Sequence, residues 1–262
     1  MSAVIEVDGV TGFRDVGGTP TADGAIRRGR LFRSGHLGGL RPRGAQTLRP
    51  LVRRVVDLRS DEEVADDAGA LIGAETVRLP LYLGSPRSFF LEDLDLGEIY
   101  SRLLTESSAP LVAAVRVIAS GAPTLVHCTA GKDRTGMVVA LALAAVDADR
   151  EAVVADYALT ASLIPAAHRR ATSERLTKKY PASRHAWMLA TESPPEVMRA
   201  ALSAVDEQWG SAAGYLRHHG LTPGELAALR EALVDTAPAT APATAPAHHS
   251  SPRHPVSQGA VS

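Results

Sequence analysis

The chain has little cysteine, little net charge and no long apolar run, and each of these shortages excludes a class of protein. Cys128 is the single cysteine among 262 residues, so no disulfide can form within the chain and nothing in its cysteine content indicates an oxidising compartment. The 28 Lys and Arg residues nearly balance the 29 Asp and Glu residues, giving a formal net charge of -1. An overall basic field that would attract nucleic acid or an anionic membrane is therefore excluded, and any preference for an acidic ligand must be local.

The apolar runs and the first residues favour a soluble protein. The longest apolar run, Met137 to Val146, is too short to span a bilayer. Glu6 and Asp8 stand where a signal peptide would carry Lys or Arg. We therefore expect a cytoplasmic protein, with export by a route that leaves no signal peptide as the alternative. We expect it to be monomeric by default, with no integral membrane segment and no nucleic acid as a partner.

Two regions of different composition divide the chain. Residues 236–262 are a Pro/Ala/Thr-rich repeat with almost no side chains able to build a core, which predicts an extended, disordered tail. The hydrophobic content of 45% is enough for one substantial core, so residues 1–235 are expected to form a single domain.

Within residues 1–235, short apolar runs alternate with segments that carry apolar residues at helical spacing. The runs that predict strands are 29–33, 54–58, 76–81 and 124–128. The segments that predict helices are 42–52, 95–104, 110–119, 135–146, 150–161, 165–179, 194–208 and 222–234. Strands separated by helices indicate an α/β fold in which helices flank a central, mainly parallel sheet. No strand-like run follows residue 150, so the C-terminal half is expected to be helical.

The most informative segment is Thr124-Leu-Val-His-Cys-Thr-Ala-Gly-Lys-Asp-Arg-Thr-Gly-Met-Val-Val-Ala. It places Cys128 at the end of a predicted strand and Arg134 six positions later, at the start of an amphipathic helix. Backbone N–H groups in such a loop point inward, the helix N-terminus adds partial positive charge, and Gly131 and Gly136 permit tight curvature. The pattern predicts a binding site for a phosphate dianion.

The residue types in this loop suit phosphoryl transfer through a covalent intermediate. The positive field favours the thiolate of Cys128, which can attack phosphorus. The planar fork of Arg134 can bind two phosphoryl oxygens and neutralise charge in the transition state. Thr135 can hydrogen-bond the thiolate as it leaves, and His127 can hold the loop by side-chain hydrogen bonds. A merely buried cysteine would leave the glycines and Arg134 at this spacing unexplained.

The stretch His127-Cys-Thr-Ala-Gly-Lys-Asp-Arg-Thr-Gly136 resembles the signature loop of the protein-tyrosine phosphatase superfamily, and specifically the atypical bacterial tyrosine phosphatases that also act on phosphoinositides. Further stretches similar to that family are 12–18, 30–34, 56–60, 155–159 and 214–217. The resemblance implies the family's fold, a mainly parallel sheet flanked by helices. It also implies hydrolysis of phosphorylated proteins or phosphoinositides without a cofactor or a metal.

The resemblance further implies a phosphate cradle made of the loop residues Thr129, Ala130, Gly131, Lys132, Asp133 and Arg134. Lys132 separates this subgroup from ordinary tyrosine phosphatases, whose loop is less charged, and is similar to the lysine of lipid phosphatases. It is expected either to meet a second phosphate on an inositol ring or to supplement Arg134 on a single phosphate.

The general acid that protonates the departing oxygen has two candidates. Asp133 lies inside the loop, as in phosphoinositide phosphatases with a similar loop, and is the favoured one. Asp57 ends a predicted strand and would face the same edge of a parallel sheet as Cys128. The structural alternative for Asp57 is an ion pair with Arg14, Arg33 or Arg59.

Between residues 81 and 110 the chain departs from those family members that hold a long helical pair over the active site. A lid built here from Phe89, Phe90 and the acidic stretch 92–98 would be small, so an open pocket is expected. Trp187 and Trp209 are expected to anchor the packing of the C-terminal helices.

Two other functions compete with a phosphatase. A non-catalytic phosphate-binding module would keep Arg134 but has no need for Cys128, Asp133 and Thr135 together. Arsenate reduction uses a comparable loop but needs further cysteines to resolve its intermediate, so a thiol would have to come from outside. The sequence therefore favours a tyrosine phosphatase of broad specificity, acting on phosphotyrosine, phosphoserine, phosphothreonine or phosphoinositides.

Overall fold

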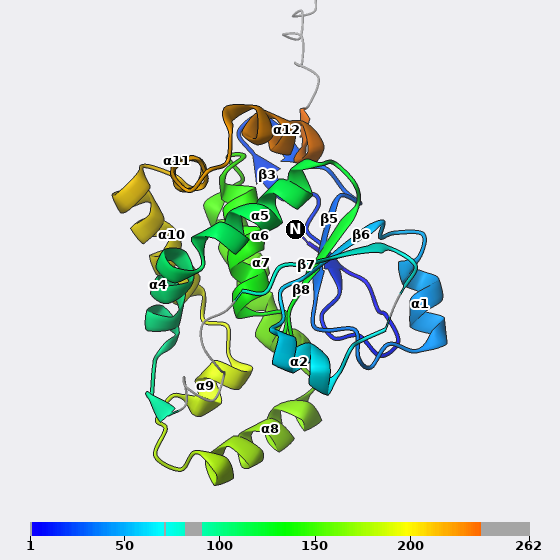
Figure 1. The fold of residues 1–262 in the computed structure, drawn as a ribbon, viewed down its shortest axis with the longest axis vertical. Helices are drawn as coiled ribbons and strands as arrows, with labels where there is room; N and C mark the ends of the chain where they lie inside the picture. Colours follow the sequence, from blue (N-terminus) through cyan, green and yellow to red (C-terminus); the bar gives the residue numbers. More distant parts are fainter. Residues whose placement is uncertain (1, 71, 82–90, 237–262) are drawn as a thin grey trace, which may run out of the picture.

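The computed structural model describes residues 2–70, 72–81 and 91–236 of the chain. These residues form a central sheet with helices packed on both faces, followed by a helical C-terminal half (Figure 1). The predicted α/β fold with a mainly parallel sheet is confirmed. Within the same ranges, no helix combines the length and the apolar character needed to cross a bilayer.

Six strands make the central sheet, in the order β1-β2-β5-β8-β6-β7. Their bounds are β1 (Ala3–Val4), β2 (Arg14–Asp15), β5 (Leu31–Ser34), β8 (Thr124–His127), β6 (Arg54–Asp57) and β7 (Glu75–Arg78). Strands β5, β8, β6 and β7 run parallel, whereas β1 and β2 add an antiparallel edge. Every residue of β5 and β8 is buried, as expected for parallel strands covered on both faces. Because β8 lies between β5 and β6, the chain leaves it at the centre of the sheet's carboxyl edge.

Eleven helices surround the sheet within the described ranges, and each of the eight predicted helical segments is among them. Their bounds are α1 (Pro42–Leu48), α2 (Asp61–Asp66), α4 (Leu96–Glu106), α5 (Ser108–Ala119), α6 (Asp133–Ala144), α7 (Arg150–Leu163), α8 (Ala166–Lys179), α9 (Ala186–Thr191), α10 (Pro195–Trp209), α11 (Ala212–His218) and α12 (Pro223–Leu233). The short helices α2, α9 and α11 were not predicted, because six or seven residues carry too little apolar periodicity to stand out.

Two apolar layers lie on opposite faces of the sheet. The larger contains Val126 of β8 together with the buried faces of α4 to α7 and α10 to α12. The smaller contains Leu125 of β8 with Phe32 and Leu48. Successive residues of a strand point to opposite faces, so β8 contributes to both layers and is fixed from both sides. Helix α6, buried from Thr135 to Leu143, forms the centre of the larger layer.

A second, three-stranded sheet corrects one prediction. It consists of β3 (Pro20–Thr21), β4 (Gly24–Ile26) and β9 (Val234–Thr236), all antiparallel. The expectation that no strand follows residue 150 was therefore wrong. Strand β9 has three residues and continues directly from α12, so it resembles a helix end in the sequence until β4 supplies its partner.

Helices α8 and α9 pack against each other at one end of the molecule, around a small apolar cluster of their own (Figure 1). This cluster consists of Leu176, Tyr180 and Ala186, with Ala190 packed against it. Trp187 of α9 is 48% exposed, so the expectation that it anchors helix packing was wrong. Trp209 does pack on the main core, with its ring centre 4.9 Å from that of Tyr215.

Candidate active site

The phosphate loop joins the end of β8 to the start of α6. Cys128 is buried, at 2% exposure, and Lys132 occupies the N-cap position of α6. Gly131 has a φ of 69°, and a Cβ there would lie 2.3 Å from the carbonyl oxygen of Ser34. Only glycine fits this close turn. The loop is thus pressed against β5, with the N-terminus of a buried helix directed at the residues that follow Cys128.

A buried ionic cluster supports the loop. Asp156 of α7 binds Arg33 Nη1 through Oδ2 at 2.7 Å and Arg14 Nε through Oδ1 at 2.8 Å, and all three side chains are at most 2% exposed. Arg33 in turn donates from Nη2 to the carbonyl oxygen of Gly131 at 2.9 Å. The stretches 30–34 and 155–159, singled out in the sequence, therefore act together: they fix the position of the loop.

Arg134 is held by Glu63, a residue that sequence reasoning missed. Nη1 of Arg134 donates to Glu63 Oε2 at 2.6 Å, and Nη2 donates to Oε1 at 2.7 Å. This bidentate pair takes one edge of the guanidinium, so the edge formed by Nε and Nη2 is the one left to meet a phosphate. Burial alone would raise the pKa of Glu63, but hydrogen bonds from Arg134 and Thr129 and the charge of Arg134 lower it from 4.5 to about 2.

The sequence does contain a signal for Glu63. Ser60 and Glu63 form a capping box at the start of α2, in which each side chain binds the other's backbone N–H. The pattern Ser-x-x-Glu directly after strand β6 predicts a helix start. It would have placed a carboxylate at the carboxyl edge of the sheet, close to the predicted position of Arg134.

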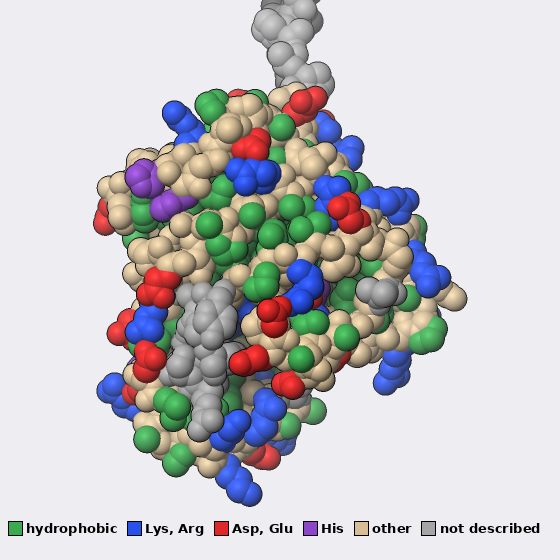
Figure 2. All heavy atoms as spheres, in the orientation of Figure 1, with side chains coloured by type: hydrophobic (Ala, Val, Ile, Leu, Met, Phe, Trp, Pro, Cys, Tyr) green, Lys and Arg blue, Asp and Glu red, His purple; other side chains and the backbone are tan. Residues whose placement is uncertain are grey.

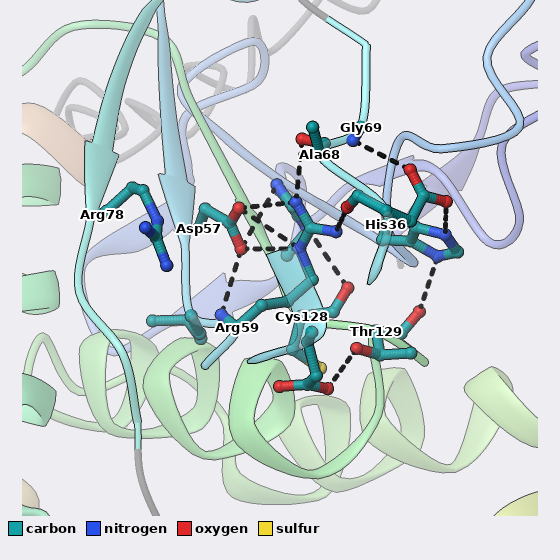
Figure 3. A network of polar contacts seen from close by, with 12 residues as sticks. His36, Asp57, Arg59, Ala68, Gly69, Arg78, Cys128 and Thr129 are labelled. Carbon is teal, nitrogen blue, oxygen red and sulfur yellow. Dashed lines mark hydrogen bonds and ion pairs between the residues drawn. The ribbon is translucent and has the colours of Figure 1, made fainter. Parts of the chain in front are cut away.

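Asp57 is buried against Arg59 rather than open to the phosphate loop. Its Oδ2 lies 2.8 Å from Nη2 of Arg59 and its Oδ1 lies 3.0 Å from Nε. Figure 3 shows the carboxylate of Asp57 facing the Arg59 guanidinium, with Cys128 and Thr129 on the neighbouring part of the loop. Burial acts to raise the pKa of Asp57, but the hydrogen bonds of Arg59 and the nearby charges outweigh it and lower the pKa below 3.8. Of the three expected structural partners, Arg59 is the one observed.

His127 holds the base of the loop, as expected from its position. Its Nδ1 lies 3.3 Å from the carbonyl oxygen of Cys128, and its Nε2 lies 3.9 Å from Oδ1 of Asp57. Burial, the largest effect, lowers the pKa of His127 below 6.5. The imidazole is therefore neutral near pH 7.

Asp133 is the more accessible carboxylate, with a side chain 25% exposed at the first position of α6. Its Oδ1 lies 2.9 Å from the hydroxyl of Tyr100, which lies 2.7 Å from the hydroxyl of Tyr157. Burial and the charge of Asp133 raise the pKa of Tyr100 well above 10.0, so this hydroxyl stays protonated and donates to Oδ1. Oδ1 of Asp133 thus accepts from Tyr100 and also lies 3.5 Å from Lys132 Nζ.

The Lys132 ammonium is bound to backbone carbonyls at the end of α9, a contact that neither expectation for this residue included. The side chain is fully buried, and Nζ donates to the carbonyl oxygens of Leu189 and Glu192 at 2.7 Å each and of Met188 at 3.4 Å. These carbonyls belong to the last turn of α9 and to its C-cap residue Glu192, and the carbonyl of Met188 also accepts from the N–H of Glu192. Lys132 therefore ties the phosphate loop to α9. The sequence gives no sign of this, because the acceptors are backbone atoms.

Replacing Lys132 by methionine is expected to loosen α9. Hydrogen bonds to a charged group typically contribute about 1.5–3 kcal/mol, so amide hydrogen exchange in α9 should accelerate roughly 10- to 100-fold. Mass spectrometry of peptides covering residues 186–192 measures this change. Lys178→Met, at an exposed position of α8, is the matched control and should leave exchange in α9 as in the wild type. Equal rates of amide hydrogen exchange in α9 of the wild type and of Lys132→Met would contradict the proposed stabilisation of α9 by Lys132.

The structure also places Thr135, Thr129 and Ala130 of the loop. Thr135 is fully buried, and its Oγ1 has no hydrogen-bond partner among the residues that the structure describes. Thr129 and Ala130 line a cavity of about 420 Å³. Thr172 and Arg175 of α8 and Ala190 of α9 also line this cavity.

Among the described residues, α8 and α9 thus line the cavity beside the loop, which the sequence did not predict. The expectation of an open pocket with at most a small lid concerns the segment 81–110, and residues 82–90 of it lie outside the described residues. Phe89 and Phe90 lie outside the described residues. Of the acidic stretch 92–98, Asp95 and Glu98 form the capping box of α4. These carboxylates are therefore used to start a helix rather than to build a cover.

Comparisons with known proteins agree with this geometry. A family model described as the tyrosine phosphatase family matches residues 5–235. The chain is 33% identical to the triple specificity protein phosphatase PtpB of Mycobacterium tuberculosis, over 88% of this chain and 99% of that protein. A protein of Cupriavidus necator that bears a tyrosine-protein phosphatase name is 29% identical, over 80% of this chain and 81% of its own length. A tyrosine-protein phosphatase of Nostoc commune is 27% identical, over 80% of this chain and 76% of its own. The chain therefore belongs to the tyrosine phosphatase family and is a phosphatase of the cysteine-based type.

Proposed function

We propose that this enzyme hydrolyses a broad range of phosphomonoesters: phosphotyrosine, phosphoserine, phosphothreonine and phosphoinositides. In this proposal Cys128 is the nucleophile and Arg134 binds the phosphate. The name of the Mycobacterium tuberculosis relative, a triple specificity phosphatase, supports the breadth of this range. The observation that carries the proposal is the arrangement at the N-terminus of α6, where the loop from Cys128 to Arg134 closes against β5 with one guanidinium edge left for phosphate.

The proposed reaction has two steps. In the first, a bond forms between Sγ of Cys128 and phosphorus while the bond from phosphorus to the leaving oxygen breaks, and the proton on Oδ2 of Asp133 passes to that oxygen. In the second, a water oxygen bonds to phosphorus, the sulfur–phosphorus bond breaks, and a proton of the water returns to Asp133. The unpartnered hydroxyl of Thr135 is the group proposed to stabilise the thiolate as it leaves.

Asp133 is proposed as the general acid in preference to Asp57. Asp133 presents a partly exposed carboxylate beside the phosphate loop, with Oδ1 fixed by Tyr100. Both oxygens of Asp57 are taken up by Arg59, which stabilises the ionised form and leaves no proton to donate. We propose that Asp57 has a structural role at the edge of the sheet.

Residues 1–235 are proposed as the catalytic domain and 236–262 as an extended tail. The cytoplasm is the proposed location, and phosphorylated proteins and phosphoinositides are the proposed partners of a monomeric enzyme.

The leaving group distinguishes the two acids experimentally. We expect Asp133→Asn to lower kcat roughly 10²- to 10⁴-fold on a phosphoserine peptide and on a soluble short-chain phosphoinositide, whose alkoxide oxygens need protonation. The loss should be smaller on an aryl phosphate with a good leaving group. Steady-state phosphate release from all three substrates, without added metal, measures this and tests the breadth of the proposed function.

Asp57→Asn is the matched comparison. It should leave the ratio of alkyl to aryl phosphate turnover as in the wild type, whatever it does to stability. The assignment is wrong if Asp57→Asn, and not Asp133→Asn, changes that ratio. Failure of the wild type to release phosphate from any of the three substrates would contradict the proposed function itself.

A further inference from the structure

Helix α8 concentrates positive charge in a chain that has almost none overall. It carries five cationic side chains and one acidic one, whereas the chain's formal net charge is -1. The five are Arg169, Arg170, Arg175, Lys178 and Lys179. None of them forms an ion pair with a residue that the structure describes, unlike the arginines elsewhere that pair with Asp or Glu. All but Arg169 are exposed.

Three exposed apolar side chains lie at the same end of the molecule. Leu91, Trp187 and Met188 are 66%, 48% and 40% exposed, and only one other large hydrophobic residue in the described ranges, Val4, is comparably exposed. Leu91 is held at this end by its neighbour Asp93, whose carboxylate accepts hydrogen bonds from Ser183 and Arg184, just before α9.

Basic and apolar groups therefore lie at the same end of the molecule, and we name them together the α8–α9 surface: the cations of α8 with Leu91, Trp187 and Met188. Figure 1 shows α8 and α9 together at one end of the molecule, and Figure 2 shows Lys and Arg side chains along that end. A merely solvated helix explains the charges but not the exposed tryptophan, methionine and leucine beside them. At a membrane–water interface, proteins use cationic side chains to bind anionic headgroups and place aromatic rings at the level of the headgroups.

We propose that the α8–α9 surface binds the surface of an anionic lipid bilayer. The charge complementarity comes from α8, and Trp187, Met188 and Leu91 enter the headgroup region. An acidic protein would use the cations alone and would leave these apolar groups in water. This binding goes beyond the proposed phosphatase activity and does not depend on it.

The α8–α9 surface is coupled to the phosphate loop through one side chain. The carbonyls of Met188 and Leu189 accept hydrogen bonds from Lys132, so the residue that reaches the bilayer also contacts the loop that binds phosphate. Arg175 lines the cavity beside Thr129 and Ala130. Docking at this end brings the loop next to the plane in which lipid phosphates lie.

Vesicle binding tests the proposal without any use of activity. We expect the full-length protein to sediment with vesicles of phosphatidylcholine containing phosphatidylserine, not with phosphatidylcholine alone, and to dissociate as salt is raised. The fluorescence of the two tryptophans should shift to the blue on binding, and Trp187→Phe should abolish the shift because Trp209 is packed on the core.

A charge-matched pair of variants locates the surface. K178Q/K179Q should weaken binding to the phosphatidylserine vesicles roughly 10- to 30-fold, as expected for two cations near an anionic surface. R43Q/R49Q makes the same change in charge on α1 and its C-cap residue, away from α8 and α9 in Figure 1, and should bind as the wild type does. K178Q/K179Q should hydrolyse a soluble aryl phosphate at the wild-type rate, which shows that it is folded.

Three results would overturn the proposal: equal binding to both kinds of vesicle, equal weakening by the two double variants, or binding of soluble polyglutamate as tight as that of vesicles with no shift in Trp187 emission. The last result would indicate an acidic protein as the partner. A protein that binds vesicles but releases no phosphate would keep this proposal and reject the proposed function.

Discussion

Cys128→Ser is expected to lower kcat by at least about 10⁴-fold while inorganic phosphate still binds, because removal of the nucleophile from a covalent enzyme leaves binding but not bond formation. The loop geometry that holds phosphate rests on Gly131, Arg33 and Arg134, none of which the substitution touches. Phosphate release from an aryl phosphate measures the loss, and titration with inorganic phosphate measures the binding that remains.

The single thiol makes a clean control possible. Iodoacetate should add one adduct to the wild type and none to Cys128→Ser, because the chain has no other cysteine, and inorganic phosphate should protect against the reaction. When the wild type is mixed with substrate and rapidly quenched, covalently bound phosphate should be found on the protein, and only at Cys128. A variant that keeps a tenth or more of the activity would show that sulfur is not the nucleophile.

Asp156→Asn is expected to destabilise the protein by about 3–5 kcal/mol, since it leaves the two buried cations Arg14 and Arg33 without a counter-charge. This is large compared with the total stability of an ordinary domain. Denaturant unfolding at pH 7 measures it. Activity should fall together with stability, because Arg33 would no longer be fixed where it holds Gly131.

The effect of Asp156 depends on pH in a definite direction. Burial tends to raise its pKa, but the charges of Arg33 and Arg14 prevail and lower it from 3.8 to about 2 in the folded protein. A carboxyl group whose pKa is lowered by folding stabilises the folded protein at pH values above its pKa in the unfolded chain. This contribution to the free energy of unfolding is lost as the pH falls through its pKa in the folded protein. Between about pH 5 and pH 2 the wild type should therefore lose about 2 kcal/mol more of its free energy of unfolding than Asp156→Asn does.

Glu151→Gln, on the same helix α7, is the matched control for Asp156→Asn. Glu151 pairs with Arg199 at 2.7 Å, but both side chains are at least 44% exposed. An exposed pair contributes about 0–1 kcal/mol, so this variant should unfold close to the wild type. If both variants lost the same free energy of unfolding, burial would not make the Asp156 ion pairs more stabilising than an exposed pair.

The sheet and the loop could be predicted because their signals are local. An apolar run followed by Cys128, glycine and Arg134 at fixed spacing identifies β8, the turn and the start of α6 within a single stretch. The helices of the C-terminal half were predicted for the same reason, since each carries its own apolar periodicity and several begin at a proline.

The partners of the loop could not be predicted in the same way. Glu63 lies 71 residues before Arg134, and Gly131 lies 98 residues after Arg33. The capping box of Ser60 and Glu63 marks a helix start, but only the strand order shows that Glu63 reaches Arg134 and that Arg33 reaches the carbonyl of Gly131. The contacts of Lys132 are even harder to predict from the sequence, because the end of any helix offers the same backbone carbonyls. The prediction for Trp187 was wrong because a large aromatic residue is usually buried, whereas this one is exposed.

Strand β8 lies in the middle of the sheet, paired in parallel with both β5 and β6. Parallel neighbours are always distant along the chain, so these pairings form slowly and late in folding, after long loops have closed. The proposed nucleophile Cys128 thus directly follows a strand that cannot be set in place before its neighbours. A peptide of residues 124–140 would contain the whole signature and none of the geometry that makes it a catalyst.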